Sequence, residues 1–210
     1  MNLTQKETIE YLKTEVKKYQ SRQRFEHTLS VLSECEKLAG IFGLGDAERF
    51  DLCKAAVLHD LTKDMNGAKQ ASLCEKYGLP VPENVSAPMP TIHQDTGAYF
   101  ARETFGNEIV DDAVFSAVAS HTTGKAGMNI TDKLLFVADY IEESRKYASC
   151  IQTREYLYAE CGKINKNDKA ALARLLDKTV ADVIGYTADF LITKRRNIDC
   201  RTILAWNDLI

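Results

Sequence analysis

The sequence lacks the features that would indicate a nucleic-acid-binding, membrane or secreted protein. Its 27 basic and 30 acidic residues give a formal net charge of −3, so no global basic surface favours nucleic acid as a partner. No apolar run approaches the roughly 20 residues that a membrane-spanning helix needs. The first seven residues, MNLTQKE, contain no apolar core of a signal peptide. We therefore expect a cytoplasmic protein, with neither a membrane nor nucleic acid among its partners.

Paired cysteines and alternating strand patterns are also missing. The six cysteines form no C-x-x-C pair and no compact framework, which is typical of a reduced protein. Cys35 and Cys53 fall on expected helix faces, where a small buried apolar residue is the default interpretation. Alternation with period two does not persist long enough anywhere to predict a strand. The fold expected from these patterns is all-α.

Helical periodicity and capping signals divide the chain into expected helices. Thr4 and Glu7 form a capping box that opens the first of them, and Gly78 is placed as the C-terminal stop of the fourth. The expected helices cover residues 4–18, 21–43, 46–60, 67–77, 93–105, 107–120, 131–145, 153–161 and 167–193, with a short terminal helix around Trp206. All four prolines lie in residues 80–90, which predicts a loop, and we expect it to lie over a shared site. We expect one domain, residues 1–210, without internal repeats.

The third expected helix ends in two adjacent polar residues, His59 and Asp60. Neighbouring residues on a helix point about 100° apart, so these two side chains can converge only on something between them. A divalent metal meets that description, because imidazole and carboxylate are common ligands of zinc, iron, manganese and nickel. The alternative is a histidine stabilised at a helix C-terminus by the helix dipole.

The remaining histidines and one unusual aspartate favour the metal. Only four histidines are present, His27, His59, His93 and His121, and each stands in or beside an apolar helical pattern. Asp139 lies within the apolar run LLFVADYI, where an ionised carboxylate is costly to bury unless it is paired or binds a metal. In chain order these residues read H…HD…H…H…D.

That order resembles the HD-domain superfamily of metal-dependent phosphohydrolases. Residues 93–99 (HQDTGAY), 121–128 (HTTGKAGM) and 136–142 (FVADYIE) further resemble the bacterial symmetrical diadenosine tetraphosphate hydrolases of the HD type, the YqeK group. The resemblance implies a helical bundle with an interior metal site. It also implies that His27, His59, Asp60 and Asp139 hold a divalent transition metal, with iron the expected ion. A second ion would take Asp60, His93 and His121.

Other residues are expected to contact the substrate or take part in the reaction. By resemblance, a diphosphate lies against His27, His93, His121, Asp139 and Arg145, and residues 196–201 (Arg196, Asn197, Ile198, Asp199, Cys200 and Arg201) follow the nucleotide. Thr122 can offer a hydroxyl to a phosphate oxygen.

Lys63, three residues after Asp60, either neutralises phosphate charge and donates a proton or is a solvated lysine. The expected catalytic residues are Asp60, Lys63, His93 and His121. His93 and His121 could be ligands of the second metal or donors to a phosphate.

The predicted activity is hydrolysis of diadenosine tetraphosphate, a small-molecule substrate, to two ADP by metal-activated water. Two alternatives stay open: an HD phosphohydrolase of another nucleotide, and a degenerate HD domain that binds nucleotide as a regulatory module. The second would be expected to have lost ligands. A homodimer also stays open.

Overall fold

The computed structural model of the protein describes residues 4–81 and 90–210. Within them it contains ten helices and no strands, which confirms the predicted all-α fold. The helices are α1 (Gln5–Val16), α2 (Arg22–Phe42), α3 (Asp46–Leu58), α4 (Gly67–Tyr77), α5 (Ile92–Phe105), α6 (Asp112–Ser120), α7 (Ile130–Ile141), α8 (Ala148–Lys163), α9 (Lys169–Thr193) and α10 (Cys200–Leu209). None of these described helices combines the length and apolar character that crossing a membrane requires.

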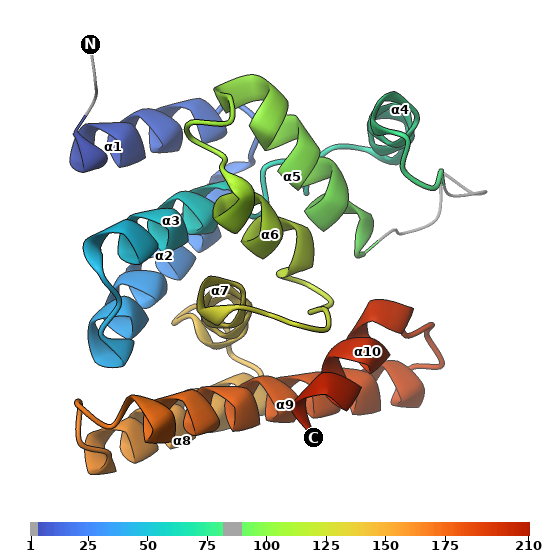
Figure 1. The fold of residues 1–210 in the computed structure, drawn as a ribbon. Helices are drawn as coiled ribbons and strands as arrows, with labels where there is room; N and C mark the ends of the chain where they lie inside the picture. The colour runs from blue at the N-terminus through green and yellow to red at the C-terminus, as the bar shows by residue number, and fades with distance from the viewer. Residues whose placement is uncertain (1–3, 82–89) are drawn as a thin grey trace.

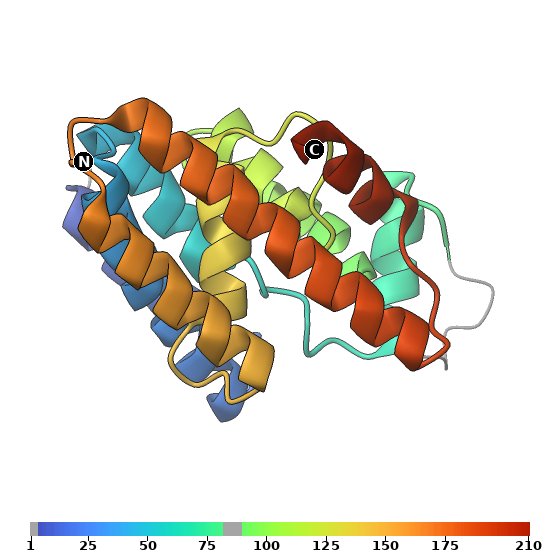
Figure 2. The same cartoon turned by 90° about the horizontal axis from the view of Figure 1, so that it is seen from below.

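Helix α7 lies at the centre of the molecule (Figure 1), with α2, α3 and α6 on one side and α8 and α9 on the other. Its sequence is apolar on nearly every side, and a helix of that kind must be surrounded by protein. Leu134, Leu135, Val137 and Ile141 accordingly have no exposed surface. In Figure 2, α8 and α9 form a long pair across one face, with α10 packed beside α9. The ligand Asp139 predicted from the sequence therefore sits on the central helix.

Local capping signals explain where most helices begin and end. The Thr4–Glu7 capping box is formed, and the Ser21 hydroxyl accepts the Arg24 N–H at the start of α2. Gly43 and Gly78 end α2 and α4 with φ of 62° and 66°. This is the left-handed region that glycine enters without a steric cost. Both stops are those expected from the sequence.

Four of the expected helices have different bounds in the structure. Helix α6 begins at Asp112 instead of residue 107, because the Asp111 side chain caps it. Helix α7 ends at Ile141 instead of residues 144–145, and α8 extends over Ala148–Lys163 instead of 153–161. Helix α10 already begins at Cys200, so Cys200 and Arg201 are helical. Most of the predicted proline loop, residues 82–89, lies outside the described residues, and its expected position over the site stays a prediction.

The end of α3 also differs from the expectation in a way that matters for the site. The α-helix stops at Leu58, and turns continue the chain with bonds from Leu61 N–H to Leu58 C=O (3.1 Å) and from Lys63 N–H to Asp60 C=O (3.2 Å). The second bond joins residues three apart, so Asp60 and Lys63 stay on the same side of the turn. Lys63 therefore reaches the site beside Asp60, as described below.

Candidate metal centre

Three parts of the chain bring the four expected metal ligands together. His27 comes from α2, His59 and Asp60 from the end of α3, and Asp139 from α7. The Nε2 atom of His27 lies 3.4 Å from His59 Nε2 and 3.1 Å from Asp139 Oδ1. His59 Nε2 lies 3.5 Å from Asp60 Oδ2, so the two adjacent side chains converge, as their spacing predicts. All four donor groups face one interior point.

The other two histidines approach the same carboxylate from its opposite side. His93 on α5 has its Nε2 3.2 Å from Asp60 Oδ1, and His121, directly after α6, has its Nε2 3.5 Å from that oxygen. The two Nε2 atoms are 3.0 Å apart. Asp60 thus directs one carboxylate oxygen toward each pair of histidines. The complete set of histidines in the chain meets around one aspartate.

Hydrogen bonds on the far side of the rings set the orientation of two of these histidines. His59 Nδ1 lies 2.8 Å from the carbonyl oxygen of Ala56, and His121 Nδ1 lies 2.7 Å from that of Val118. A carbonyl oxygen can only accept, so both Nδ1 atoms carry the proton. The Nε2 lone pairs of His59 and His121 therefore point into the centre. Metal-binding histidines have this arrangement, with the outer N–H bonded to a backbone or carboxylate oxygen.

His27 is oriented by a carboxylate whose role the sequence reasoning did not assign. Glu142 is completely buried, and its Oε1 lies 3.2 Å from His27 Nδ1. The Ser144 backbone N–H donates to the other oxygen of Glu142 at 2.7 Å. Burial alone would raise the Glu142 pKa, but hydrogen bonds led by that with His27 lower it to about 2. One signal could have found it, since Glu142 follows Asp139 by three residues and so shares its helix face.

The donor atoms satisfy a geometric requirement for metal binding. In the described part of the chain, His27, His59 and Asp139 form one group, and His59, Asp60 and His121 form another. Within each group the three ligand atoms lie within 4.8 Å of one another. Lone pairs and carboxylate oxygens this close together repel unless a cation lies between them. The residues present therefore fit a divalent ion, with His59 common to both groups.

The protonation of His27 points to the same conclusion. Burial lowers the pKa of His27, but hydrogen bonds and charge from Asp139 and Glu142 outweigh it and raise the value to about 9. In the absence of metal, His27 is therefore positively charged at neutral pH. The Arg145 charge, acting against burial, holds the pKa of Asp139 well below its usual range. The ionised carboxylate of Asp139, which is partly buried, therefore lies beside a protonated imidazole, and this arrangement stabilises positive charge at the centre.

His93 differs from the other three histidines and belongs to neither group of ligands. Its Nε2 lies 3.2 Å from Asp60 Oδ1 and 3.0 Å from His121 Nε2, and the Lys63 ammonium group, which can only donate, lies 3.1 Å from it. A proton on Nε2, or a cation between the two Nε2 atoms and the carboxylate, would each stabilise this arrangement. Burial, together with the charge of Lys63, lowers the His93 pKa to about 3, so the ring is neutral. The two roles expected from the sequence, ligand of a second metal and donor to a phosphate, both stay predictions.

Lys63 lies inside the site and is not a solvated lysine. Its Nζ lies 3.1 Å from both ring nitrogens of His93, a position over the ring and not in line with either nitrogen. The Nζ also donates to the Pro90 carbonyl oxygen at 3.3 Å. Burial lowers the pKa of Lys63. These contacts favour the first of the two alternatives, in which the ammonium group neutralises negative charge next to His93.

Two arginines pair with the aspartate ligands. Arg145 donates from Nη2 to Asp139 Oδ1 at 2.6 Å and from Nε to the Asp139 carbonyl oxygen at 3.1 Å. Arg24 donates from Nη1 to Asp60 Oδ2 at 2.7 Å. The sequence reasoning singled out Arg145 but missed Arg24, which stands three residues before His27 and so shares its face of α2. Both guanidinium groups lie where they could also meet a phosphate.

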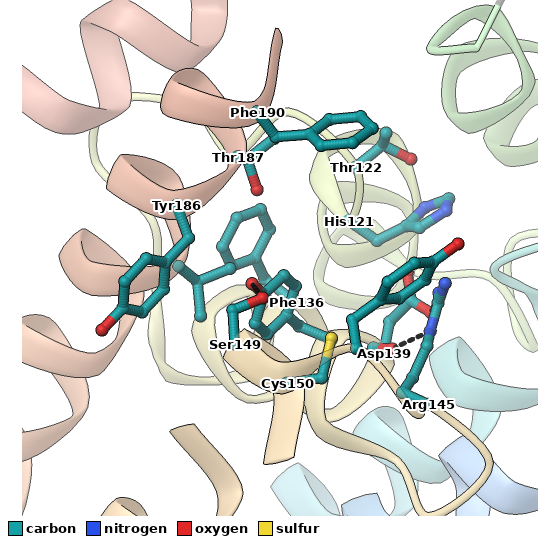
Figure 3. Close-up of a pocket in the computed structure, with 13 residues that line it drawn as sticks. His121, Thr122, Phe136, Asp139, Arg145, Ser149, Cys150, Tyr186, Thr187 and Phe190 are labelled. Carbon is teal, nitrogen blue, oxygen red and sulfur yellow. Dashed lines mark hydrogen bonds and ion pairs between the residues drawn. The ribbon is translucent and has the colours of Figure 1, made fainter. Parts of the chain in front are cut away.

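Two cavities open beside the centre, and Arg145 lines both. The first, about 300 Å³, lies between α7, α8 and α9 and is lined mainly by apolar and aromatic side chains together with His121, Thr122 and Asp139 (Figure 3). The second, also about 300 Å³, is polar and includes Arg24 and His27. Thr122 Oγ1 lies 3.1 Å from His93 Nε2, which places this predicted phosphate contact at the edge of the centre.

The predicted nucleotide segment, residues 196–201, lies elsewhere. Arg201 forms an ion pair of 2.8 Å with Asp95, two residues after His93, and a second pair of 2.9 Å with Asp199. Ile198 lines a separate apolar cavity beside Trp206. Arg196, Asn197 and Cys200 are exposed. None of these six residues lines either described cavity at the centre, so their expected contact with nucleotide stays a prediction.

Comparison with known proteins places these residues in a family pattern. Residues 24–144 match the HD domain. A symmetrical bis(5'-nucleosyl)-tetraphosphatase of Staphylococcus aureus is 30% identical over 95% of this chain and 96% of the relative. A protein of the same name from Halalkalibacterium halodurans is 28% identical over 93% of each chain. Both alignments cover nearly the whole chain.

A solved structure shares the fold. The crystal structure of an HD superfamily hydrolase from Clostridium acetobutylicum superposes with a TM-score of 0.75 and covers 95% of both chains, at 24% sequence identity. The similarity extends beyond the matched HD domain to the C-terminal helices. It confirms that the ten described helices form an HD-type helical bundle.

Proposed function

The chain belongs to the HD domain family, and we propose that it hydrolyses diadenosine tetraphosphate symmetrically, giving two molecules of ADP. The observation that carries the proposal is the convergence of all four histidines on Asp60, with Asp139 and two arginines beside them. Such a centre can bind metal and a chain of phosphates at the same point. The predicted hydrolase class agrees with the names of the relatives described above.

We propose that His27, His59, Asp60 and Asp139 hold one divalent ion, with iron the expected metal. A second ion would use Asp60 and His121, as the second group of donors suggests. His93, whose Nε2 lies 3.2 Å from Asp60 Oδ1 and 3.0 Å from His121 Nε2, would either complete this second set of ligands or donate a proton to a phosphate. When bound, such an ion lowers the pKa of a coordinated water and neutralises phosphate charge.

The remaining residues of the centre act on the phosphates directly. Arg145 and Arg24 can transfer hydrogen bonds from the aspartates to phosphate oxygens once the metal shares the carboxylate charge. His93 can donate its Nε2 proton to the departing ADP, and Lys63 neutralises charge that develops beside it. The Thr122 hydroxyl can bond to a phosphate oxygen next to His93. Residues 196–201 would contact a nucleotide from the α5 side, where Asp95 anchors Arg201.

We further propose that residues 1–210 act as one catalytic domain. Helices α8 and α9 lie beyond the matched residues 24–144, yet they pack on α7 and form one wall of the cavity at the centre. The cytoplasmic location and the homodimer stay predictions.

The alternatives differ in what they require of the centre. A degenerate nucleotide-binding module would not need to keep every ligand, whereas here all six expected histidine and aspartate positions are filled and brought together. To separate an enzyme for another nucleotide from the proposed one, the protein would be stripped with chelator and reloaded with ferrous, manganous or zinc ion. Rates would then be measured on a panel of dinucleoside polyphosphates, mononucleotides and cyclic dinucleotides.

We expect the protein to turn over substrate only after it has been reloaded with metal, with diadenosine tetraphosphate as the best substrate. Asp60→Ala should abolish metal binding and activity while the helical circular dichroism spectrum is retained, because Asp60 faces both groups of histidines. Faster turnover of a mononucleotide than of any dinucleotide would assign the centre to a different phosphohydrolase.

A further inference from the structure

Gln94 follows His93 on α5 and is completely buried, although its side chain is polar. Its Oε1 accepts the backbone N–H groups of Thr122 and Thr123, at 3.0 Å and 3.2 Å. Its Nε2 donates to Thr123 Oγ1 at 2.9 Å. A buried amide that makes three hydrogen bonds to one short segment fixes the position of that segment, because each of these groups is costly to leave unpaired.

The segment that Gln94 holds carries two groups of the candidate centre. The Nε2 atom of His121 lies 3.5 Å from Asp60 Oδ1, and the hydroxyl of the next residue, Thr122, lies 3.1 Å from His93 Nε2. Both side chains line the cavity beside the centre (Figure 3). We propose that Gln94 is a positioning residue, which holds the turn after α6 so that His121 directs its Nε2 lone pair and Thr122 its hydroxyl to the centre. The inference rests on the proposed function for the role of Thr122.

The backbone after α6 explains why this turn needs an acceptor from another helix. If α6 continued, the Thr122 N–H would bond to the carbonyl oxygen of Val118, four residues earlier. That oxygen instead lies 2.7 Å from His121 Nδ1, and this bond points the Nε2 lone pair inward. Gln94 Oε1 accepts the Thr122 N–H in place of the Val118 oxygen. The Val118 oxygen is thereby left to His121, so the orientation of the His121 ring depends on a side chain of α5.

The far end of the same turn is held independently of Gln94. The Gly124 N–H bonds to the carbonyl oxygen of the last residue of α6 at 2.8 Å, and the Gly127 N–H bonds to Asp208 of α10 at 2.8 Å. Loss of the Gln94 side chain should therefore loosen residues 121–123 without releasing the rest of the turn. The expected defect is a local displacement of two groups of the centre and not a loss of the fold.

The tautomer of His121 gives a readout that needs neither metal nor substrate. In the metal-free parent, NMR of the histidine ring nitrogens should show the His121 proton on Nδ1, and His121→Asn identifies the signal. Gln94→Met has a side chain of similar length without donor or acceptor. It should give a mixture of the two tautomers, because the Thr122 N–H then competes for the Val118 oxygen. Gln94→Glu keeps an oxygen that can accept both N–H groups and should restore the parental tautomer.

Kinetics of the metal-loaded protein on diadenosine tetraphosphate measure the consequence for the reaction. Gln94→Met should lower kcat/KM by about 10- to 100-fold, the scale of losing the outer support of a group at the centre. In a Thr122→Val background, which lacks the hydroxyl, the same substitution should cost less, because part of its effect acts through Thr122.

Tyr158→Phe is the control for reduced stability. It removes a hydrogen bond from α8 to the buried Glu34 of α2, and neither residue lines a described cavity at the centre. The control should lower the melting temperature and leave both the His121 tautomer and kcat/KM unchanged.

The proposal is overturned if Gln94→Met keeps the parental tautomer or the parental kcat/KM, whatever its melting temperature. It is also overturned if Gln94→Glu gives the same tautomer mixture as Gln94→Met, or if Tyr158→Phe lowers kcat/KM as much as Gln94→Met does. The proposed function can fail separately: if the parent does not cleave diadenosine tetraphosphate, the tautomer of His121 still decides whether Gln94 holds the turn.

Discussion

The Nδ1 atom of His27 lies 3.2 Å from a carboxylate oxygen of Glu142, a residue with no exposed surface at all. The two residues are 115 positions apart in the chain and come from α2 and from the end of α7. This contact orients the His27 ring so that its Nε2 faces Asp139 and His59. The position of a predicted metal ligand therefore depends on a buried carboxylate that does not itself reach the centre.

Replacing Glu142 by glutamine keeps the shape of the side chain but removes the charge that stabilises the His27 N–H. We expect Glu142→Gln to weaken metal binding by about 10- to 100-fold, the usual cost of losing an outer partner of a ligand histidine. Competition titration with a metal-sensitive dye measures the affinity. The neighbouring Glu143 is exposed, so Glu143→Gln is the matched control and should bind metal like the parent. Equal affinity of Glu142→Gln and the control would show that Glu142 has no such role.

Metal binding should strengthen as pH rises from 6 toward 9. In the metal-free protein His27 has a pKa of about 9, so a metal that uses its Nε2 must displace a proton at neutral pH. The affinity should then rise by up to about tenfold for each pH unit in this window. Titrations at constant ionic strength, corrected for hydroxide binding to the metal, give the slope. A flat profile over this range would mean that His27 does not exchange a proton for metal.

The melting temperature of the metal-free protein should fall over the pH range in which metal binding strengthens. The pKa of His27 is raised in the folded state from its ordinary value of 6.5, so the stabilisation from its ion pairs is fully present below about pH 6.5. That stabilisation is lost as pH rises through about 9. The melting temperature of the chelated protein should therefore fall across this window, and His27→Gln should remove that part of the fall.

Arg145→Ala should reduce catalysis more than it reduces metal content. Arg145 contacts Asp139 and lines both cavities, so it is placed to meet the phosphate chain between them. We expect kcat/KM to fall by about ten- to a thousand-fold, the scale of losing one charged contact in the transition state. Lys146→Ala, at the next and exposed position, is the control for a general change in charge. Unchanged kinetics in Arg145→Ala would place the guanidinium outside the reaction.

His93→Gln distinguishes a proton donor from a metal ligand. Because His93 is in neither group of donors, the variant should keep the metal content of the parent. Loss of a general acid should nevertheless lower kcat by about 10²- to 10⁴-fold. Metal analysis beside steady-state kinetics gives both quantities. Loss of one metal ion per chain in His93→Gln would instead assign His93 to a second metal site.

Several helix ends with local signals could be predicted, although the local caps Asp111 and Asp199 were missed, and ends held by distant contacts could not. Thr4, Ser21 and Gly78 each act through bonds within a few residues, and their boundaries were confirmed. Helix α8 begins after Tyr147, which provides no side-chain cap, so its first turn had no sequence signal. Helix α7 ends early because Arg154, thirteen residues later, donates to the Ile141 carbonyl oxygen and at 2.6 Å to that of Glu142. A contact of that kind cannot be read from the residues near the helix end.

The same distinction holds for the site. The order of histidines and aspartates along the chain indicated the ligands, because residues of this type are rare in apolar helices. Their partners were missed because a glutamate or an arginine on a helix usually indicates solvent exposure. The three-residue spacings from Asp139 to Glu142 and from Arg24 to His27 placed each partner on the face of a ligand. The packing of α2 against α7 and the end of α3 then show which residue each partner contacts.

The most direct test of the proposed activity is product analysis of a single substrate in heavy-oxygen water. Metal-loaded protein would be incubated with diadenosine tetraphosphate, and the products would be separated and identified by mass spectrometry. Attack on an inner phosphorus, with His93 donating to the departing half, predicts ADP as the only product and one labelled ADP for each unlabelled one. Formation of AMP and ATP would contradict the account, because it would place the broken bond at an outer phosphate.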